Sequence, residues 1–330
     1  MTKLIRLFFA LLWLATEYGL TARRCSYARN DEQVATQKDF HIPPNSDSSN
    51  NRSARWTNGN GRITRLKIMR EKHVPSSVFK LRALQRLEVH HTCFEPCDQQ
   101  TIPANIQCLA SSLTELEIND IKLTRLPWQI GLLTNLKTLK LSHTGLTSLP
   151  DTIGHLSSLN MLYLSNNHLE GLPENIRALI KLTYIGLSNN RPLHSIQALN
   201  GLPYLRTIDA KNCSIEEIPH NLLHLTRLYL SQNNLTHLTY IGHLGHGTKT
   251  PKSFYFEQNR IEHFPSGLDR IPNLQRLKLD HNNLTLLSED LYKIPSLIYL
   301  NIAFNRIENR EIEKYRSRLR INSPKLEFLT

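Results

Sequence analysis

The chain has 330 residues, a formal net charge of +12 and five cysteines. This length exceeds that of one ordinary compact core and predicts two domains or a repeat array, while so few cysteines exclude a small disulfide scaffold. A hydrophobic content of 40% excludes wholesale disorder, and the basic surplus favours acidic partners or anionic surfaces, or else serves only solubility.

Residues 1–22 have the pattern of a secretory signal peptide. Lys3 and Arg6 precede the apolar run 7–15, and small residues close the segment. The run is about half as long as a membrane-spanning helix requires, and no later stretch is apolar enough to span. We predict cleavage after Ala22 and a secreted, extracellular product without stable membrane insertion; an uncleaved signal anchor is the alternative.

Residues 23–60 are predicted to form a flexible N-terminal arm. The prolines at 43–44 and the polar residues 45–53 are typical of a linker. This stretch is polar and too short for a further catalytic domain.

From Leu113 to Leu205 the chain repeats itself every 23 residues, as the segment LKTLKLSHTGLTSLPDTIGHLSS at 136–158 illustrates, and the copy at Leu225 arrives after 20 residues. Such self-similarity predicts structural units that stack on one another, because one unit alone cannot bury its apolar face. An insertion at 245–252 disturbs the register. The copies begin at Leu113, Leu136, Leu159, Leu182, Leu205, Leu225, Ser253, Leu274 and Leu297, with degenerate copies at Ile63 and Leu84.

Each copy is predicted to contain one short strand and one bend. Apolar and polar residues alternate over 162–167, as in a half-buried strand, and Pro173 follows where no backbone donor is needed. Asparagine recurs at the bend, and its amide can both donate and accept hydrogen bonds with the exposed backbone there. Thr144 and Cys213 can do this in part, whereas Ile121 cannot, so we expect the turn from Leu113 to be the least regular. The asparagines are Asn167, Asn190, Asn233, Asn259, Asn282 and Asn305.

These copies resemble leucine-rich repeats of the LxxLxLxxNxLxxLPxxIxxL type over residues 63 to about 312. The resemblance implies an α/β solenoid: a horseshoe with a parallel β-sheet on its concave face and 3₁₀, irregular or short helical segments on its convex face. We therefore divide the chain after the arm into an N-terminal cap with degenerate repeats and disulfides (61–112), leucine-rich repeats (113–312) and a C-terminal cap (313–330).

The cysteines fit an extracellular protein of this type. Cys25, Cys93, Cys97 and Cys108 precede the regular repeats, and extracellular family members commonly have disulfide-bonded caps. The resemblance implies two bridges with three possible connectivities, and we favour a bridge from Cys93 or Cys97 to Cys108. Cys213, at an asparagine position, is expected to be a buried free thiol.

No metal or cofactor is expected. The spacing of His90 and His91 from Cys93 and Cys97 fits no standard zinc site. The pair His243 and His246 lies in the glycine-containing insertion, where exposure explains it better than metal binding.

Four Asn-x-Ser/Thr triplets are candidate glycosylation sites. Asn234 and Asn283 lie just beyond the asparagine position, where a glycan would clear the core, and Asn51 lies in the arm. Asn212 is a poor acceptor because a cysteine follows it and because it is expected to point toward the inner face.

Polar strand positions should face solvent on the concave sheet, with equivalent residues of neighbouring turns about 5 Å apart. Tyrosine offers a rigid surface with a polar tip and is favoured at binding sites, although a half-polar sheet also tolerates it. Arginine and lysine beside it suit an acidic or phosphate-bearing epitope, and Glu257 and Asp280 reduce that charge. Glu115, Glu117 and Asp120 are expected to form a separate acidic patch. The predicted partner-binding residues are Tyr163, Tyr184, Arg227, Tyr229, Tyr255, Glu257, Arg276, Lys278 and Tyr299.

The sequence contains no G-x-S-x-G, P-loop or HExxH motif, so no enzymatic activity is expected. The resemblance implies a secreted recognition module that binds a protein or glycan partner, and not nucleic acid. The alternative is an intracellular scaffold, because LxxLPxxIxxL turns also resemble those of intracellular regulators of small GTPases and phosphatases.

Overall fold

The computed structural model describes residues 25, 36–37, 40–41, 53–322 and 325–330. The predicted signal peptide, most of the predicted arm and the triplet at Asn51 lie outside these residues. Among the residues described, no helix has the length and apolar character needed to cross a membrane.

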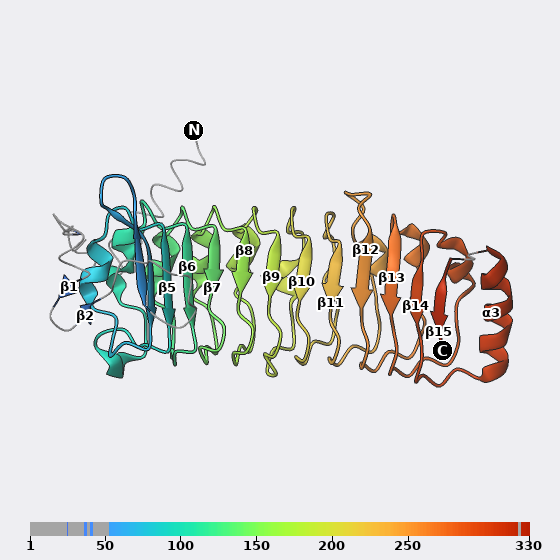
Figure 1. Ribbon diagram of the computed structural model, residues 1–330. Coiled ribbons are helices and arrows are strands. Elements are labelled where there is room, and N and C mark those ends of the chain that lie inside the picture. Colours follow the sequence, from blue (N-terminus) through green and yellow to red (C-terminus); the bar gives the residue numbers. More distant parts are fainter. Residues whose placement is uncertain (1–24, 26–35, 38–39, 42–52, 323–324) are drawn as a thin grey trace, which may run out of the picture.

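Successive turns stack side by side into one long sheet of thirteen strands, whose order in space is their order in the chain (Figure 1). Neighbouring strands are parallel except for β3 and β4, which pair antiparallel at the N-terminal end. The strands are β3 (Ala54–Thr57), β4 (Ile63–Met69), β5 (Arg86–His90), β6 (Glu115–Asn119), β7 (Thr138–Lys140), β8 (Met161–Tyr163), β9 (Tyr184–Gly186), β10 (Thr207–Asp209), β11 (Arg227–Tyr229), β12 (Lys252–Tyr255), β13 (Leu274–Lys278), β14 (Tyr299–Asn301) and β15 (Glu327–Leu329). A separate two-stranded sheet pairs β1 (Thr36–Gln37) with β2 (Phe40–His41).

Short 3₁₀ helices form the opposite side of most turns, and one α-helix, α3 (Asn309–Asn322), lies at the C-terminal end (Figure 1). The predicted solenoid is confirmed: the strands form one side, which we call the inner face, and the 3₁₀ helices lie on the opposite side. The 3₁₀ helices are η1 (Ser76–Lys80), η2 (Cys97–Gln99), η3 (Ala104–Leu109), η4 (Trp128–Leu132), η5 (Asp151–His155), η6 (Glu174–Ala178), η7 (Gln197–Leu199), η8 (Ile241–His243), η9 (Leu268–Arg270) and η10 (Glu289–Lys293).

The repeat leucines build one continuous core between the sheet and the 3₁₀ helices. In the turn from Leu159, the side chains of Leu159, Leu162 and Leu164 are fully buried, whereas Met161 and Tyr163 face solvent. Full burial of a leucine side chain contributes about 1.5–3 kcal/mol. Each turn adds several such residues, and its neighbours cover them on both sides.

The asparagines that recur at the bend of each turn, which we call the asparagine column, join consecutive turns as predicted. The Asn167 amide donates to the carbonyls of Leu141 (2.7 Å) and Leu164 (2.9 Å), and its Oδ1 accepts the backbone N–H of Leu146 (3.2 Å). Asn190, Asn233, Asn259, Asn282 and Asn305 repeat this pattern. These bonds satisfy buried backbone groups at the bend, where no strand partner exists.

Three positions depart from the column. Thr144 is too short to reach the preceding turn, so the Leu123 N–H donates to the Thr144 backbone carbonyl at 2.8 Å instead. Ile121 is buried and has no polar group to offer. Cys213 is a buried free thiol, as expected; its Sγ lies 3.4 Å from the Leu187 carbonyl, and burial raises its pKa to about 11.

The expected bridge to Cys108 was assigned to the wrong partner. Cys25 pairs with Cys108, and Cys93 pairs with Cys97. Cys93 and Cys97 lie at the two ends of one tight turn, with Cα atoms 5.2 Å apart, so they close on each other. Cys108, near the end of η3, therefore pairs with Cys25 of the N-terminal segment.

Candidate functional site

The N-terminal part of the inner face is covered by a network of ion pairs. Arg86 contacts Glu88 at 2.8 Å and Glu115 at 2.7 Å, while Lys140 contacts Glu117 at 2.7 Å and Glu115 at 3.4 Å. Burial opposes the charge on Lys140, but its hydrogen bond to Glu117 and the attraction of that carboxylate raise its pKa. The acidic patch predicted from Glu115 and Glu117 is therefore wrong, because basic residues of adjacent turns neutralise both.

The middle and late turns carry the tyrosines. Tyr229 in β11 and Tyr255 in β12 are direct neighbours in register, and their rings stack with centroids 4.7 Å apart and planes 16° apart. Both residues are partly exposed. Burial raises the pKa of Tyr229, so its hydroxyl stays protonated at neutral pH and can donate a hydrogen bond.

A second tyrosine pair lies on β8 and β9, on the N-terminal side of this stack. The rings of Tyr163 and Tyr184 are 4.7 Å apart and tilted by 36°. They meet diagonally, because Tyr163 lies opposite Gly186 in register and the Tyr184 ring occupies the space that a side chain at Gly186 would fill. Burial raises the pKa of Tyr184 to about 12.

Three cations flank the later tyrosines without being neutralised. Arg227, Arg276 and Lys278 form no ion pair with any carboxylate in the described part of the chain. Arg276 lies over the Tyr299 ring, 5.5 Å from its centroid. Positive charge on this part of the face therefore remains available to a partner.

The nine predicted partner-binding residues lie on or next to the strands of the inner face, but not in one cluster. Tyr163 and Tyr184 form one group, and the stack of Tyr229 on Tyr255 with the surrounding charged residues forms the other. Lys211 was missed: its Nζ lies 4.4 Å from the centre of the Tyr229 ring. Its position just after β10, one turn before Tyr229 in β11, is the sequence feature that could have indicated this contact.

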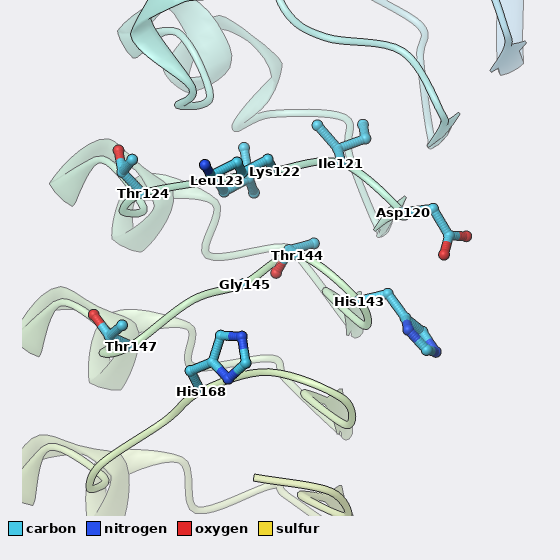
Figure 2. A pocket seen from close by; sticks show the side chains of 10 residues that line it. All are labelled: Asp120, Ile121, Lys122, Leu123, Thr124, His143, Thr144, Gly145, Thr147 and His168. Carbon is cyan, nitrogen blue, oxygen red and sulfur yellow. The ribbon is translucent and has the colours of Figure 1, made fainter. Parts of the chain in front are cut away.

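A shallow hollow of about 650 Å³ opens beside the inner face, where the asparagine column is interrupted (Figure 2). Figure 2 shows the side chains of Asp120 and His143 projecting at one end of the hollow and those of Thr124 and Thr147 at the other. Ile121 and Thr144, at asparagine positions, both line it.

The candidate glycosylation triplets differ in their surroundings. Asn234 and Asn283 are partly exposed at the edge that leaves the sheet. The Asn212 amide instead donates to the Asn189 side chain at 2.7 Å, within a short ladder that continues from Asn189 to Asn166 at 2.8 Å. A glycan on Asn212 would break this ladder.

Comparison with known proteins agrees with the architecture. A family profile described as leucine-rich repeat region matches residues 116–313. No curated protein matches the chain. Among solved structures, a chain of the glycosylated Toll–Spatzle complex of Drosophila is similar with a TM-score of 0.66 and 22% identity, over 82% of this chain and 36% of that one.

Two further structures are similar over most of their own length. An internalin from Listeria monocytogenes has a TM-score of 0.58 and 20% identity, over 81% of this chain and 79% of its own. A plant ice-binding protein has a TM-score of 0.58 and 22% identity, over 77% and 84%. At such identities the likeness concerns the fold alone. Because the family profile spans more than half of the chain, and the turns carry the repeat leucines and asparagines in place, the protein belongs to the leucine-rich repeat family.

Proposed function

We propose that this protein is a secreted recognition module that binds a protein or glycan partner through the C-terminal half of its inner face and catalyses no reaction. The observation that carries the proposal is the stack of Tyr229 on Tyr255, flanked by Arg227, Arg276 and Lys278. Rigid aromatic side chains bind with little loss of conformational entropy, and unneutralised cations beside them attract an acidic or phosphate-bearing epitope.

The binding residues we assign are of two kinds. The stacked tyrosines with the three cations and Glu257 form the central patch, and Tyr299 extends it toward the C-terminal end. Tyr163 and Tyr184 form an outlying contact. The N-terminal turns contribute little to affinity, because their charges are already paired with one another.

Secretion is supported by the predicted signal peptide together with the two disulfides of the N-terminal turns. Disulfides persist in oxidising compartments and are rare in the cytosol. We propose Asn51, Asn234 and Asn283 as glycan acceptors. Two of these lie on the edge of the solenoid, where a glycan would leave the tyrosine patch uncovered.

The experiment is to screen the secreted protein against surface proteins, glycans and glycosaminoglycans, and to measure each hit against Tyr229→Ala with Tyr255→Ala. Because the rings lie on the surface of the sheet, the double variant should be secreted and melt normally but lose ligand capture. Substitution of Tyr204, which is 54% exposed but lies off the inner face, is the matched control. Unchanged affinity of the double variant would reject this patch.

An intracellular scaffold is the alternative function. It predicts an intact N-terminus, free thiols in place of the two bridges, and a mass that glycosidase treatment does not change. Mass spectrometry of the protein expressed in eukaryotic cells separates the two functions.

A further inference from the structure

One edge of the solenoid carries no acidic residue over eight successive turns. This edge, which we call the entry edge, consists of the segments through which the chain enters strands β7 to β14. These segments contain lysine, arginine and histidine but neither aspartate nor glutamate. They are residues 134–137, 157–160, 180–183, 203–206, 223–226, 245–252, 272–275 and 295–298.

Backbone hydrogen bonds join these segments into one continuous row. The Asn160 N–H donates to the Lys137 carbonyl at 2.8 Å, and the Thr183 N–H donates to the Asn160 carbonyl at 2.8 Å. The Arg206 N–H then donates to the Thr183 carbonyl at 2.9 Å. Segments bonded in this way lie about 5 Å apart. Equivalent side chains of successive turns therefore lie next to one another along the entry edge.

The insertion in front of β12 belongs to the entry edge. Figure 1 shows the loop that precedes β12 projecting beyond the loops of the neighbouring turns. The Gly247 N–H donates to the Leu223 carbonyl at 2.6 Å, and the Asn273 side chain donates to the Lys249 carbonyl at 2.8 Å. The loop is thus bonded to the turn before it and to the turn after it, and it holds the exposed Lys249 on this edge.

Four cations of the entry edge are exposed to solvent: Lys137, Lys181, Arg206 and Lys249. Within the part of the chain that the structure describes, none of them forms an ion pair with a carboxylate. Because the segments around them contain no acid, their positive potentials add along the edge. The edge therefore attracts a partner that presents negative charge over a long stretch.

Large hydrophobic side chains lie among these cations. Ile180 and Tyr204 are each 54% exposed, and Leu223 in the next turn is 49% exposed. The Tyr204 ring contacts His224 of that next turn, with ring centroids 5.6 Å apart. Hydrophobic side chains that are exposed side by side mark a contact with another protein or with a membrane.

We propose that the entry edge docks on the surface of an anionic phospholipid bilayer. The cations would contact lipid phosphates and carboxylates, and Ile180 and Leu223 would enter the boundary between headgroups and acyl chains. An anionic bilayer presents one sign of charge over its whole area, as the acid-free edge requires, whereas a protein surface presents both signs. A sulfated glycan or a nucleic acid would use the cations but offers no apolar phase to Ile180 and Leu223.

The candidate glycan acceptors leave this edge uncovered. Asn234 and Asn283 follow the bend after β11 and after β13, so they lie in segments through which the chain leaves the strands. These segments are at the opposite edge of the sheet. A glycan on either asparagine would therefore point away from a bilayer that is bound at the entry edge.

The probe is a vesicle of two parts phosphatidylcholine to one part phosphatidylserine, and vesicles of phosphatidylcholine alone are the reference. The full chain should co-sediment with the first vesicle and not with the second. Because salt screens exposed charges, the affinity should fall as the ionic strength rises. Equal binding to both vesicles, or binding to neither, would overturn the proposal. This comparison needs no variant.

Lys181→Gln with Lys249→Gln tests the cations. Each lysine near an anionic bilayer strengthens binding about fivefold, so the double variant should bind the phosphatidylserine vesicles roughly tenfold or more weakly. Lys122→Gln with Arg125→Gln is the matched control, because both residues are exposed in the segment that leaves β6 and the same charge is lost. An equal loss of affinity in the two double variants would show that only net charge matters, and would overturn the assignment to this edge.

Ile180→Ser with Leu223→Ser distinguishes a bilayer from other polyanions, because it keeps every charge. This variant should bind the phosphatidylserine vesicles roughly fivefold or more weakly and should bind heparin as wild type does. Leu286→Ser, at a residue that is 64% exposed in the segment leaving β13, is the control and should bind the vesicles normally. Unchanged vesicle affinity of the Ile180 and Leu223 variant would overturn the bilayer and assign the edge to a sulfated glycan or a nucleic acid.

This inference stands apart from the proposed function of the inner face. Tyr229→Ala with Tyr255→Ala should bind the vesicles as wild type does, and the lysine variant of the entry edge should still capture the partner of the inner face. Loss of vesicle binding in the tyrosine variant would overturn the entry edge as the docking surface. All substituted side chains are exposed, and melting curves that match wild type check that the variants fold.

Discussion

Pro192 and Cys213 occupy the two positions that a hydrogen bond joins in regular consecutive turns. Pro192 lacks the backbone N–H that would donate, and Cys213 lacks the side-chain oxygen that would accept. In a regular turn the asparagine Oδ1 accepts the backbone N–H 21 residues earlier, as Asn190 does from Leu169 at 3.0 Å. Counting 21 residues back from 213 gives 192, where proline has no N–H. Cys213 has no side-chain oxygen that would need this N–H donor, and its Sγ contacts the carbonyls of Leu187 (3.4 Å) and Lys211 (3.6 Å).

Cys213→Asn restores the repeat consensus but should destabilise the protein. The new Oδ1 would be buried without a donor, which costs about 1–3 kcal/mol. Pro192→Ala in the same chain supplies the missing N–H and should recover part of this loss. Urea unfolding of the four proteins of the double-mutant cycle measures the coupling. Strictly additive effects would contradict the proposed pairing.

Lys252→Ala should be among the most destabilising single changes in the insertion. Lys252 is fully buried in place of a repeat leucine, and its Nζ donates to the carbonyls of Thr248 (2.8 Å), Thr250 (3.2 Å) and Pro272 (2.5 Å). Burial lowers its pKa, but the three carbonyls would all be left without donors in the variant. We expect a loss of about 2–4 kcal/mol in thermal or urea unfolding. Lys249→Ala, exposed in the same loop, is the control and should change stability by less than about 0.5 kcal/mol.

His90 should make the N-terminal turns sensitive to acid. Burial lowers its pKa below the ordinary value of 6.5, against the attraction of Glu117, whose Oε1 lies 3.6 Å from the ring. Between the lowered pKa and 6.5 the unfolded chain binds more protons than the folded one. The contribution of His90 is therefore complete above 6.5 and decreases as the pH falls through this window.

Melting temperatures between pH 7.5 and pH 5 check this prediction. His90→Gln should show a smaller decrease than wild type across that range. His91→Gln is the matched control, because His91 is exposed and its pairing with Asp120 lies at the surface. An identical pH profile for wild type and His90→Gln would refute the assignment.

The regular part of the fold was predictable because every turn uses the same leucines for the same contacts. The period of 23 residues places each strand, and the alternation around Leu162 separates the core face from the inner face. The neutralisation of Glu115 was not anticipated, because its partner Arg86 lies one turn away along a degenerate copy whose register is hard to align. The burial of Lys252 could not be foreseen either, since an insertion that shifts the register hides which leucine the lysine replaces.

The sequence predicted which residues of the candidate site lie on the face of the sheet, but not which of them contact one another. Tyr229 and Tyr255 were both predicted to lie on the solvent-facing side of the sheet, and their stacking follows from their direct register. The partner of Tyr184 depends on a diagonal contact over Gly186, which alignment of equivalent positions does not show.

Gly186→Ala should weaken partner binding without lowering stability of the core. A Cβ at Gly186 would lie 3.0 Å from the Tyr184 Oη and 3.2 Å from its Cε1, closer than ordinary contact, so the ring must shift by a few tenths of an ångström and its contact with Tyr163 is disturbed. If the partner contacts Tyr163 and Tyr184, displacing the Tyr184 ring should weaken binding roughly two- to tenfold, which corresponds to about 0.5–1.5 kcal/mol of binding free energy. Gly171→Ala is the control, because a Cβ there meets no atom within 4 Å. The measurement is titration of a partner from the binding screen against both variants, together with their melting curves. Equal affinities would remove Tyr163 and Tyr184 from the binding face. A lower melting temperature for Gly186→Ala alone would assign the glycine to packing of the sheet.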